Sequence, residues 1–193
     1  MNKPKIALRT ALSLAFFVAA HAVAAPDDIV PMTYEGTVSD ITPATLSSVC
    51  PINIIQVFDQ RLSKEGISTA IPVVASAPEP WIHSGLDRLK AYGFTVQHNS
   101  QPVANAVNLN VRLIRAYTWN VDMRINGMVA LDVDVLGSNG QRTEKIRAAG
   151  SKSNIWGAKS EYVTALNYSF NHALHKMAHV LQSECTQARL AMR

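Results

Sequence analysis

The amino-acid sequence predicts an α+β fold: a mostly antiparallel sheet with two main helices packed on one face. Two observations carry this prediction. Apolar and polar residues alternate along residues 107–121 and again along 129–136, as they do in strands that bury one face. Within residues 160–185, apolar side chains recur every three or four positions, which is the spacing of a helix that packs on a sheet.

The first 24 residues have the pattern of a secretory signal peptide. Basic residues come first, an apolar stretch over residues 11–20 follows, and Ala22-Val23-Ala24 fits a small-x-small cleavage site. The apolar stretch is shorter than the roughly 20 residues that span a bilayer, and no cysteine directly follows the cleavage site to accept a lipid. We therefore expect a periplasmic or secreted protein without a transmembrane segment or lipid anchor.

This leading segment also accounts for most of the positive charge. Of the 18 basic residues it holds three, and of the 14 acidic residues none, so residues 25–193 carry 15 basic and 14 acidic side chains. A nearly neutral chain without a block of Lys or Arg lacks the electrostatic features of proteins that bind nucleic acid or anionic lipid. Neither kind of partner is expected.

Residues 25–51 are expected to form an extended leader with one short strand, and residues 52–193 a single α+β domain. Prolines interrupt any longer regular element in the leader. The domain begins with a compact apolar run at residues 53–58, which predicts a buried strand. Residues 71–74 are a further candidate strand.

A first helix is predicted to begin near Pro78 and to end at Gly93. Proline is favoured in the first turn of a helix, and the helix dipole stabilises the carboxylate of Glu79 there. Ile82 and Leu86 then keep the helical spacing. Glycine commonly ends a helix because it adopts left-handed backbone angles at little cost.

A hairpin is predicted around Asn139-Gly140, because this dipeptide is favoured in two-residue turns between alternating strands. Counting from the turn places opposite charges directly across from one another on the polar face. These pairs are Asp134 with Lys145 and Asp132 with Arg147. Carboxylates in the spacing Asp-x-Asp also occur in metal and acid–base sites, but the cross-strand partners give them a sufficient structural role.

The second helix is predicted over residues 160–185. Cys185 continues its apolar stripe and therefore points inward, towards Cys50, which precedes the first strand. Since the sequence contains only these two cysteines and export is expected, we predict a Cys50–Cys185 disulfide. The stripe consists of Val163, Leu166, Phe170, Leu174, Met177 and Leu181.

Three histidines on the second helix are candidates for metal binding. His172, His175 and His179 lie on one side of the helix, and a spacing of four residues suits two zinc ligands. They fall on the side opposite the apolar stripe, where a solvent-exposed helix face rich in histidine is the favoured explanation, and metal binding or pH sensing is the alternative. A metal site also needs a third or fourth ligand, which the sequence does not identify.

Two further groups are candidates for a ligand or partner surface. Asp59 and Arg61 follow the first buried strand, where they form either an exposed site or an ion pair at the end of the strand. The second group consists of aromatic residues that either line a groove for an apolar ligand or pack between helix and sheet. They are Trp81, Tyr117, Trp119 and Trp156.

Common catalytic motifs are absent from the sequence. It contains no G-x-S-x-G nucleophile elbow, no H-E-x-x-H zinc motif and no G-x-x-x-x-G-K phosphate loop. We therefore expect neither an enzyme nor a bound cofactor.

The order of these features resembles the YajG-type family of bacterial envelope lipoproteins. The resemblance implies an α+β domain with helices on one face of a mostly antiparallel sheet, without established catalytic residues. Family members are typically lipidated at an N-terminal cysteine, which this sequence lacks. The resemblance covers residues 52–183 and includes Asp59-Gln60-Arg61, Gly93-Phe94-Thr95-Val96, Val107-Asn108-Leu109, Asn139-Gly140, Ala165-Leu166-Asn167 and Met177.

We expect an exported accessory or adaptor protein of the bacterial cell envelope, which acts through contacts with an unidentified partner protein rather than by catalysis. The alternative is a periplasmic carrier of a small apolar ligand, held in a pocket between helix and sheet. An adaptor requires an exposed apolar patch or an unpaired strand edge. A carrier requires an apolar cavity of roughly a few hundred Å³.

Overall fold

The computed structural model describes residues 29–62, 67, 74–76, 78–137, 140–153 and 158–191. The expected signal peptide and most of the candidate strand at residues 71–74 lie outside the described residues. The strands are β1 Ile29–Pro31, β2 Pro51–Asp59, β3 Val74–Ser76, β4 Thr95–Gln97, β5 Val107–Val121, β6 Arg124–Gly137 and β7 Gly140–Ser153. The helices are α1 Pro78–Leu86, the 3₁₀ helix η2 Asp87–Tyr92, and α2 Lys159–Ala191.

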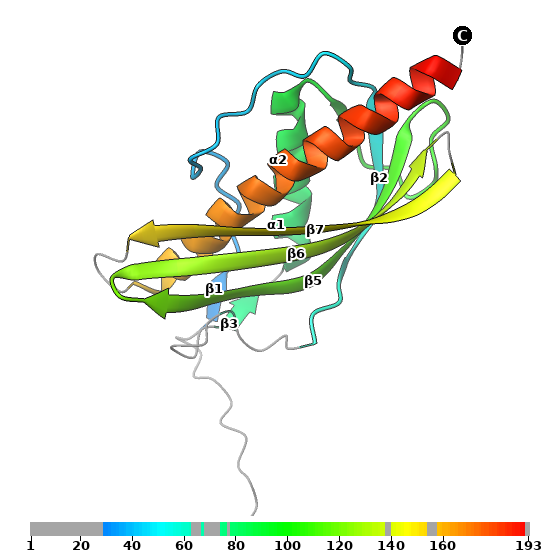
Figure 1. Cartoon of the computed structure of the whole chain (residues 1–193). Coiled ribbons are helices and arrows are strands. Elements are labelled where there is room, and N and C mark those ends of the chain that lie inside the picture. The colour runs from blue at the N-terminus through cyan, green and yellow to red at the C-terminus, as the bar shows by residue number, and fades with distance from the viewer. Residues whose placement is uncertain are drawn as a thin grey trace, which may run out of the picture.

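A five-stranded sheet in the order β4-β2-β5-β6-β7 forms the centre of the fold (Figure 1). Strands β5, β6 and β7 are antiparallel, whereas β2 runs parallel to both of its neighbours, β4 and β5. The predicted α+β class is confirmed, and the sheet is mixed: its three longest strands are antiparallel, and the two pairings of β2 are parallel. The β2–β4 pair is parallel because α1 and η2 carry the chain back to the same end of the sheet. A separate small sheet pairs β1 with β3 in parallel.

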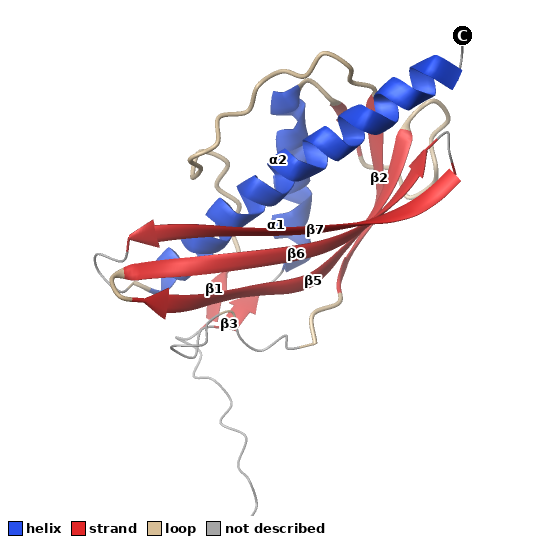
Figure 2. Ribbon diagram, viewed as in Figure 1, coloured by secondary structure: helices blue, strands red, loops and turns tan. Residues whose placement is uncertain are grey.

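Both helices lie on the same side of the sheet, and α2 runs diagonally across it (Figure 2). The first helix is α-helical to Leu86 and continues as η2 to Gly93, whose φ of 97° is the left-handed conformation predicted there. The second helix continues past its predicted end at Cys185 to Ala191. The six residues of its predicted apolar stripe are each at most 5% exposed.

The predicted disulfide is present between Cys50 and Cys185, whose Cα atoms lie 5.5 Å apart. It joins the residue before β2 to the C-terminal half of α2, across a sequence separation of 135 residues. Closing a loop of this length stabilises a fold by about 4–5 kcal/mol in the chain-entropy model. The disulfide therefore fixes one end of α2 to the sheet.

In its N-terminal half, α2 approaches the sheet so closely that only glycine fits beneath it. Gly127 of β6 and Gly150 of β7 are cross-strand partners. A Cβ atom at Gly127 would lie 2.5 Å from the carbonyl oxygen of Ala165, and one at Gly150 would lie 2.7 Å from the backbone nitrogen of Ser169. This close contact sets the distance between the helix and strands β6 and β7.

A β-bulge changes which side chains of β5 face the helices. The pairing of β5 with β6 shifts between Leu113 and Arg115. Up to Leu113 the odd-numbered residues are buried, as predicted, but beyond the bulge Thr118 faces α2 and is fully buried. Tyr117 and Trp119 therefore lie on the opposite side, which we call the open face of the sheet, and the prediction that they share the buried face is wrong.

The predicted hairpin between β6 and β7 is confirmed, but its register is wrong by two residues. Gly137 pairs with Gly140, so that Asp132 faces Lys145 and Asp134 faces Thr143. A shift of two residues leaves the same side chains on each face, so the burial pattern is equally satisfied by both registers. The predicted pairs Asp134–Lys145 and Asp132–Arg147 are therefore wrong, and Asp134–Thr143 and Asp132–Lys145 take their place.

We expect Gly127→Ala to lower the free energy of unfolding by about 1–3 kcal/mol, because the added methyl group collides with the backbone of α2. Urea denaturation followed by circular dichroism measures this change. Ala149→Ser is the matched control, since Ala149 lies one residue from Gly150 but is exposed, and it is expected to change stability by less than about 0.5 kcal/mol. Equal stability of the two variants would contradict the close approach of α2.

Candidate functional site

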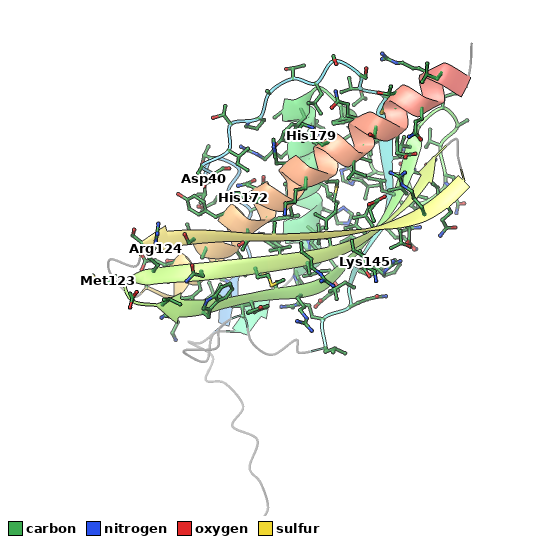
Figure 3. The ribbon with its side chains drawn as sticks, in the orientation of Figure 1. Asp40, Met123, Arg124, Lys145, His172 and His179 are labelled. Carbon is green, nitrogen blue, oxygen red and sulfur yellow. A yellow bond between two sulfur atoms is a disulfide. The ribbon has the colours of Figure 1, made fainter. Side chains whose placement is uncertain are left out.

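Of the three histidines predicted as metal candidates, His175 and His179 pack against each other, with ring centroids 4.8 Å apart. His172 bonds through Nε2 to the carboxylate of Asp40, whereas His175 places Nδ1 3.4 Å from the hydroxyl of Tyr92. Figure 3 shows His172 beside Asp40 and His179 farther along α2. Burial, and then the charges of the neighbouring histidines, lower the pKa of His175. Within the described part of the chain, no group of three or more His, Cys, Asp or Glu residues could hold a metal ion.

Asp59 and Arg61 form a buried ion pair. Arg61 donates from Nε and Nη2 to the two carboxylate oxygens of Asp59, at 2.8 and 2.9 Å. The two side chains are only 3% and 6% exposed. The pair closes the end of β2, next to a hydrogen bond from the Gln60 amide to the Leu113 carbonyl. The alternative that these residues form an exposed site is wrong.

The Asp-x-Asp carboxylates differ in their surroundings. Asp134 accepts hydrogen bonds from Arg112 of β5 and from the hydroxyl of Thr143. The hydrogen bond from Arg112 is the main reason that the pKa of Asp134 lies below its ordinary value. Asp132 is half-buried and faces Lys145 across the strands. The partner of Asp134 is thus an arginine on the other neighbouring strand, rather than the predicted lysine.

Of the four candidate aromatic residues the structure describes three, and Trp81 lies apart from Tyr117 and Trp119. Trp81 is 1% exposed, donates from Nε1 to Asn167 at 2.7 Å, and packs against Phe170 with ring centroids 4.4 Å apart. It joins α1 to α2 inside the core, so it lines no surface groove. Tyr117 and Trp119 lie half-buried on the open face, with their ring centroids 5.5 Å apart. Trp156 lies outside the described residues.

A cavity of about 830 Å³ lies at one end of the sheet. Four segments meet there: the C-terminal turns of α2, residues 49–51 at the start of β2, the 98–106 loop before β5, and the facing ends of β6 and β7 (Figure 1). We call it the end cavity. It is partly open, and apolar side chains provide most of its lining, among them Val49, Pro51, Val103, Val107, Leu136 and Ala188.

Covalent and polar contacts hold α2 as one wall of the end cavity. Both half-cystines of the Cys50–Cys185 disulfide line the cavity. One turn farther along α2, Arg189 donates from Nη2 to the carbonyl oxygen of Val49 at 3.0 Å. Since Val49 precedes β2, these two contacts tie the same stretch of helix to the same end of the sheet.

Two buried asparagines hold the loop that forms the opposite wall. Asn53 of β2 and Asn108 of β5 are direct partners in the sheet and are 0% and 7% exposed. Asn108 accepts a hydrogen bond from the Val103 amide at 2.8 Å and donates to the carbonyls of Val103 and Ala106, each at 3.1 Å. Asn53 donates to Asn108 at 2.9 Å and accepts from the backbone amide of Asn99 at 2.9 Å.

Little in the sequence indicates this site. The alternation along residues 107–121 predicts that Asn108, at an even-numbered position, lies on the polar face, and no chemical motif marks the 98–106 loop. The available signal was a pair of amides within otherwise apolar strand segments, because a buried amide usually binds backbone groups of a nearby loop. Recognising it requires knowing that β2 and β5 are neighbours.

Neither α1 nor α2, among the described residues, combines the length and the apolar character that crossing a bilayer requires.

No protein-family model matches this chain, and no curated protein matches it. Among solved structures it is similar to an uncharacterized protein, with 12% identity over 74% of this chain and 97% of that one and a TM-score of 0.47. A hypothetical protein from Chlamydia trachomatis gives 11% identity, 71% and 98% coverage, and a TM-score of 0.43. A "putative lipoprotein" from Caulobacter crescentus gives 10% identity, 64% and 92% coverage, and a TM-score of 0.39.

We expect Asp134→Asn to lower the free energy of unfolding by about 1.5–3 kcal/mol at neutral pH, through its charged hydrogen bonds. Because the folded state lowers the pKa of Asp134, this stabilisation is complete above the ordinary value of 3.8 and is lost as the pH falls through the lowered value. Urea denaturation at several pH values should show the difference from wild type shrinking in acid. A difference that is constant down to pH ~2 would contradict this role, and Asp132→Asn serves as the control.

We expect Asn108→Ala to lower the free energy of unfolding by about 1–3 kcal/mol, because it leaves buried backbone groups of the loop without hydrogen-bond partners. Hydrogen exchange of the Val103 amide should accelerate more than exchange in β6, since the loop loses its anchor before the sheet unfolds. Asn126→Ala, at a half-buried position in β6, is the control. Unchanged exchange at Val103 would show that Asn108 does not hold the loop.

Proposed function

We propose that this protein is a non-catalytic binding protein that holds a small apolar ligand in the end cavity. The cavity itself carries the proposal: its volume of about 830 Å³ falls within the range of roughly 300–1,000 Å³ that is common for ligand sites. Its walls are fixed before any ligand arrives, one by the disulfide and the other by the two asparagines. Such preorganisation lowers the entropic cost of binding.

We place this function outside the cytoplasm, in the periplasm or beyond. The Cys50–Cys185 disulfide supports the location, because protein disulfides persist in oxidising compartments. The signal-peptide pattern of the first 24 residues supports it independently. Membership of the YajG-type family of envelope proteins belongs to the same proposal, and the α+β arrangement is consistent with it.

The adaptor role is a second candidate function, supported by the open face of the sheet. Tyr117 and Trp119 stack there, and Met123 is 75% exposed at the turn between β5 and β6 (Figure 3). Basic side chains are also exposed on strands β5, β6 and β7, which suits a partner protein with an acidic face. They are Arg115, Arg124, Lys145 and Arg147.

We expect the wild-type protein to bind the apolar probe N-phenyl-1-naphthylamine, with a gain in fluorescence, and Ala188→Trp to weaken binding at least about tenfold by filling the end cavity. Thr186→Trp is the matched control, because Thr186 lies on the same helix but is exposed and does not line the cavity. Titration of all three proteins measures the affinities.

Binding of the probe to Ala188→Trp with wild-type affinity would exclude the end cavity as the site. The same kind of substitution also distinguishes the ligand-binding function from the adaptor function. An adaptor would lose its partner when Trp119 on the open face is replaced by serine, and would keep it in Ala188→Trp.

A further inference from the structure

The end cavity has a single charged residue in its described lining, and that residue is basic. Arg189 lies on the last turn of α2, its side chain is exposed, and it belongs to the lining of the cavity. None of the ion pairs within the described residues involves it. A positive charge at the rim of an otherwise apolar cavity is therefore available to a ligand.

The hydrogen bonds of Arg189 leave room for an anion. A guanidinium has five N–H donors in a planar fork, and the structure records one bond, from Nη2 to the Val49 carbonyl at 3.0 Å. That bond fixes the guanidinium next to the cavity without neutralising its charge, because a carbonyl is uncharged. The remaining donors suit a carboxylate or a phosphate, which arginine binds through two parallel hydrogen bonds.

The acidic residues near this end do not cancel the charge. Glu184 lies one turn before Ala188 on α2, and its Oε2 atom is directed at Gly137 of the cavity lining. The Glu184 side chain is only 3% exposed and is paired with Arg142, with Nη1 2.6 Å from Oε1. Arg142 also contacts Glu144 at 2.9 Å. Arg142 is thus shared between two glutamates, which leaves the cluster one negative charge, but Glu184 is buried and does not belong to the lining of the cavity.

We infer that the ligand of the end cavity is an amphiphile with an alkyl chain and one anionic group, the chain lying in the cavity and the anion on Arg189. This inference rests on the proposed function and goes further by naming the class of ligand. Charge complementarity favours it over a neutral or cationic amphiphile of the same length, because Arg189 attracts only the anionic one. Free fatty acids and phosphate-bearing lipids share this chemistry.

Displacement of N-phenyl-1-naphthylamine by four twelve-carbon amphiphiles, each below its micelle concentration, tests the inference. They are dodecanoate, dodecyl phosphate, dodecanol and dodecylammonium. We expect both anions to compete at least about tenfold more strongly than the cation, with dodecanol between them. The stronger of the two anions identifies carboxylate or phosphate as the preferred head group.

Variants at Arg189 connect this preference to the proposed residue. Arg189→Gln should remove most of the preference for anions and leave the affinity for dodecanol unchanged, and Arg189→Glu should reverse the preference. Arg189→Lys should retain much of it, since it keeps the charge but loses the planar fork. Arg147→Glu is the control, because it makes the same change in net charge at an exposed position of β7 that does not line the cavity.

The possible failures are distinguishable. Equal displacement by all four amphiphiles, or a preference for anions that persists in Arg189→Glu, would overturn the inference and leave the proposed function standing. If neither the probe nor any amphiphile binds the wild-type protein, both fail together.

Discussion

The packing of α2 on the sheet is the interaction on which the rest of this structure depends. The apolar stripe of the helix lies against β6 and β7, and the missing side chains at Gly127 and Gly150 let its backbone come close. The same helix also holds the segment before β2, through Asn167, which donates to the Thr33 carbonyl at 2.9 Å, and Asn171, which donates to the Val38 carbonyl at 2.6 Å. One element therefore supplies both the apolar core and the polar contacts of the leader.

The end cavity follows from the same arrangement. Because α2 crosses the sheet diagonally (Figure 2), its C-terminal turns pass over the end where β2 and β5 begin, rather than along the middle of the strands. Protein interiors normally close on empty apolar space, since each unfilled volume forfeits dispersion contacts. Here the disulfide on one side and the buried Asn53–Asn108 pair on the other restrain the two walls that would have to move.

Periodicity predicted the parts of the fold that each lie within one stretch of sequence: α2, the hairpin of β6 and β7, and the first half of β5. The disulfide was also predictable, because Cys185 continues the stripe of the helix. The β5 bulge was not predictable. One extra residue exchanges the two faces of the strand, and after Leu113 both faces of β5 carry apolar and polar side chains, so the pattern does not show which face is buried. The end cavity was not predictable either, because its lining comes from segments that only the parallel β2–β5 pairing brings together.

The buried ion pairs and the arginine at the cavity have different energetic roles. Removing a buried ion pair such as Asp59–Arg61 from water costs on the order of several kcal/mol per ion, and the mutual attraction of the two charges mainly offsets that cost. Such pairs specify the geometry of β2 and β5 but offer little to a ligand. Arg189 is exposed and has no carboxylate partner among the described residues, so no ion pair within the folded protein neutralises its charge. Arg189 can therefore form an ion pair with a bound anion. For this reason an unpaired charge beside an apolar cavity is more informative about function than the more numerous paired charges.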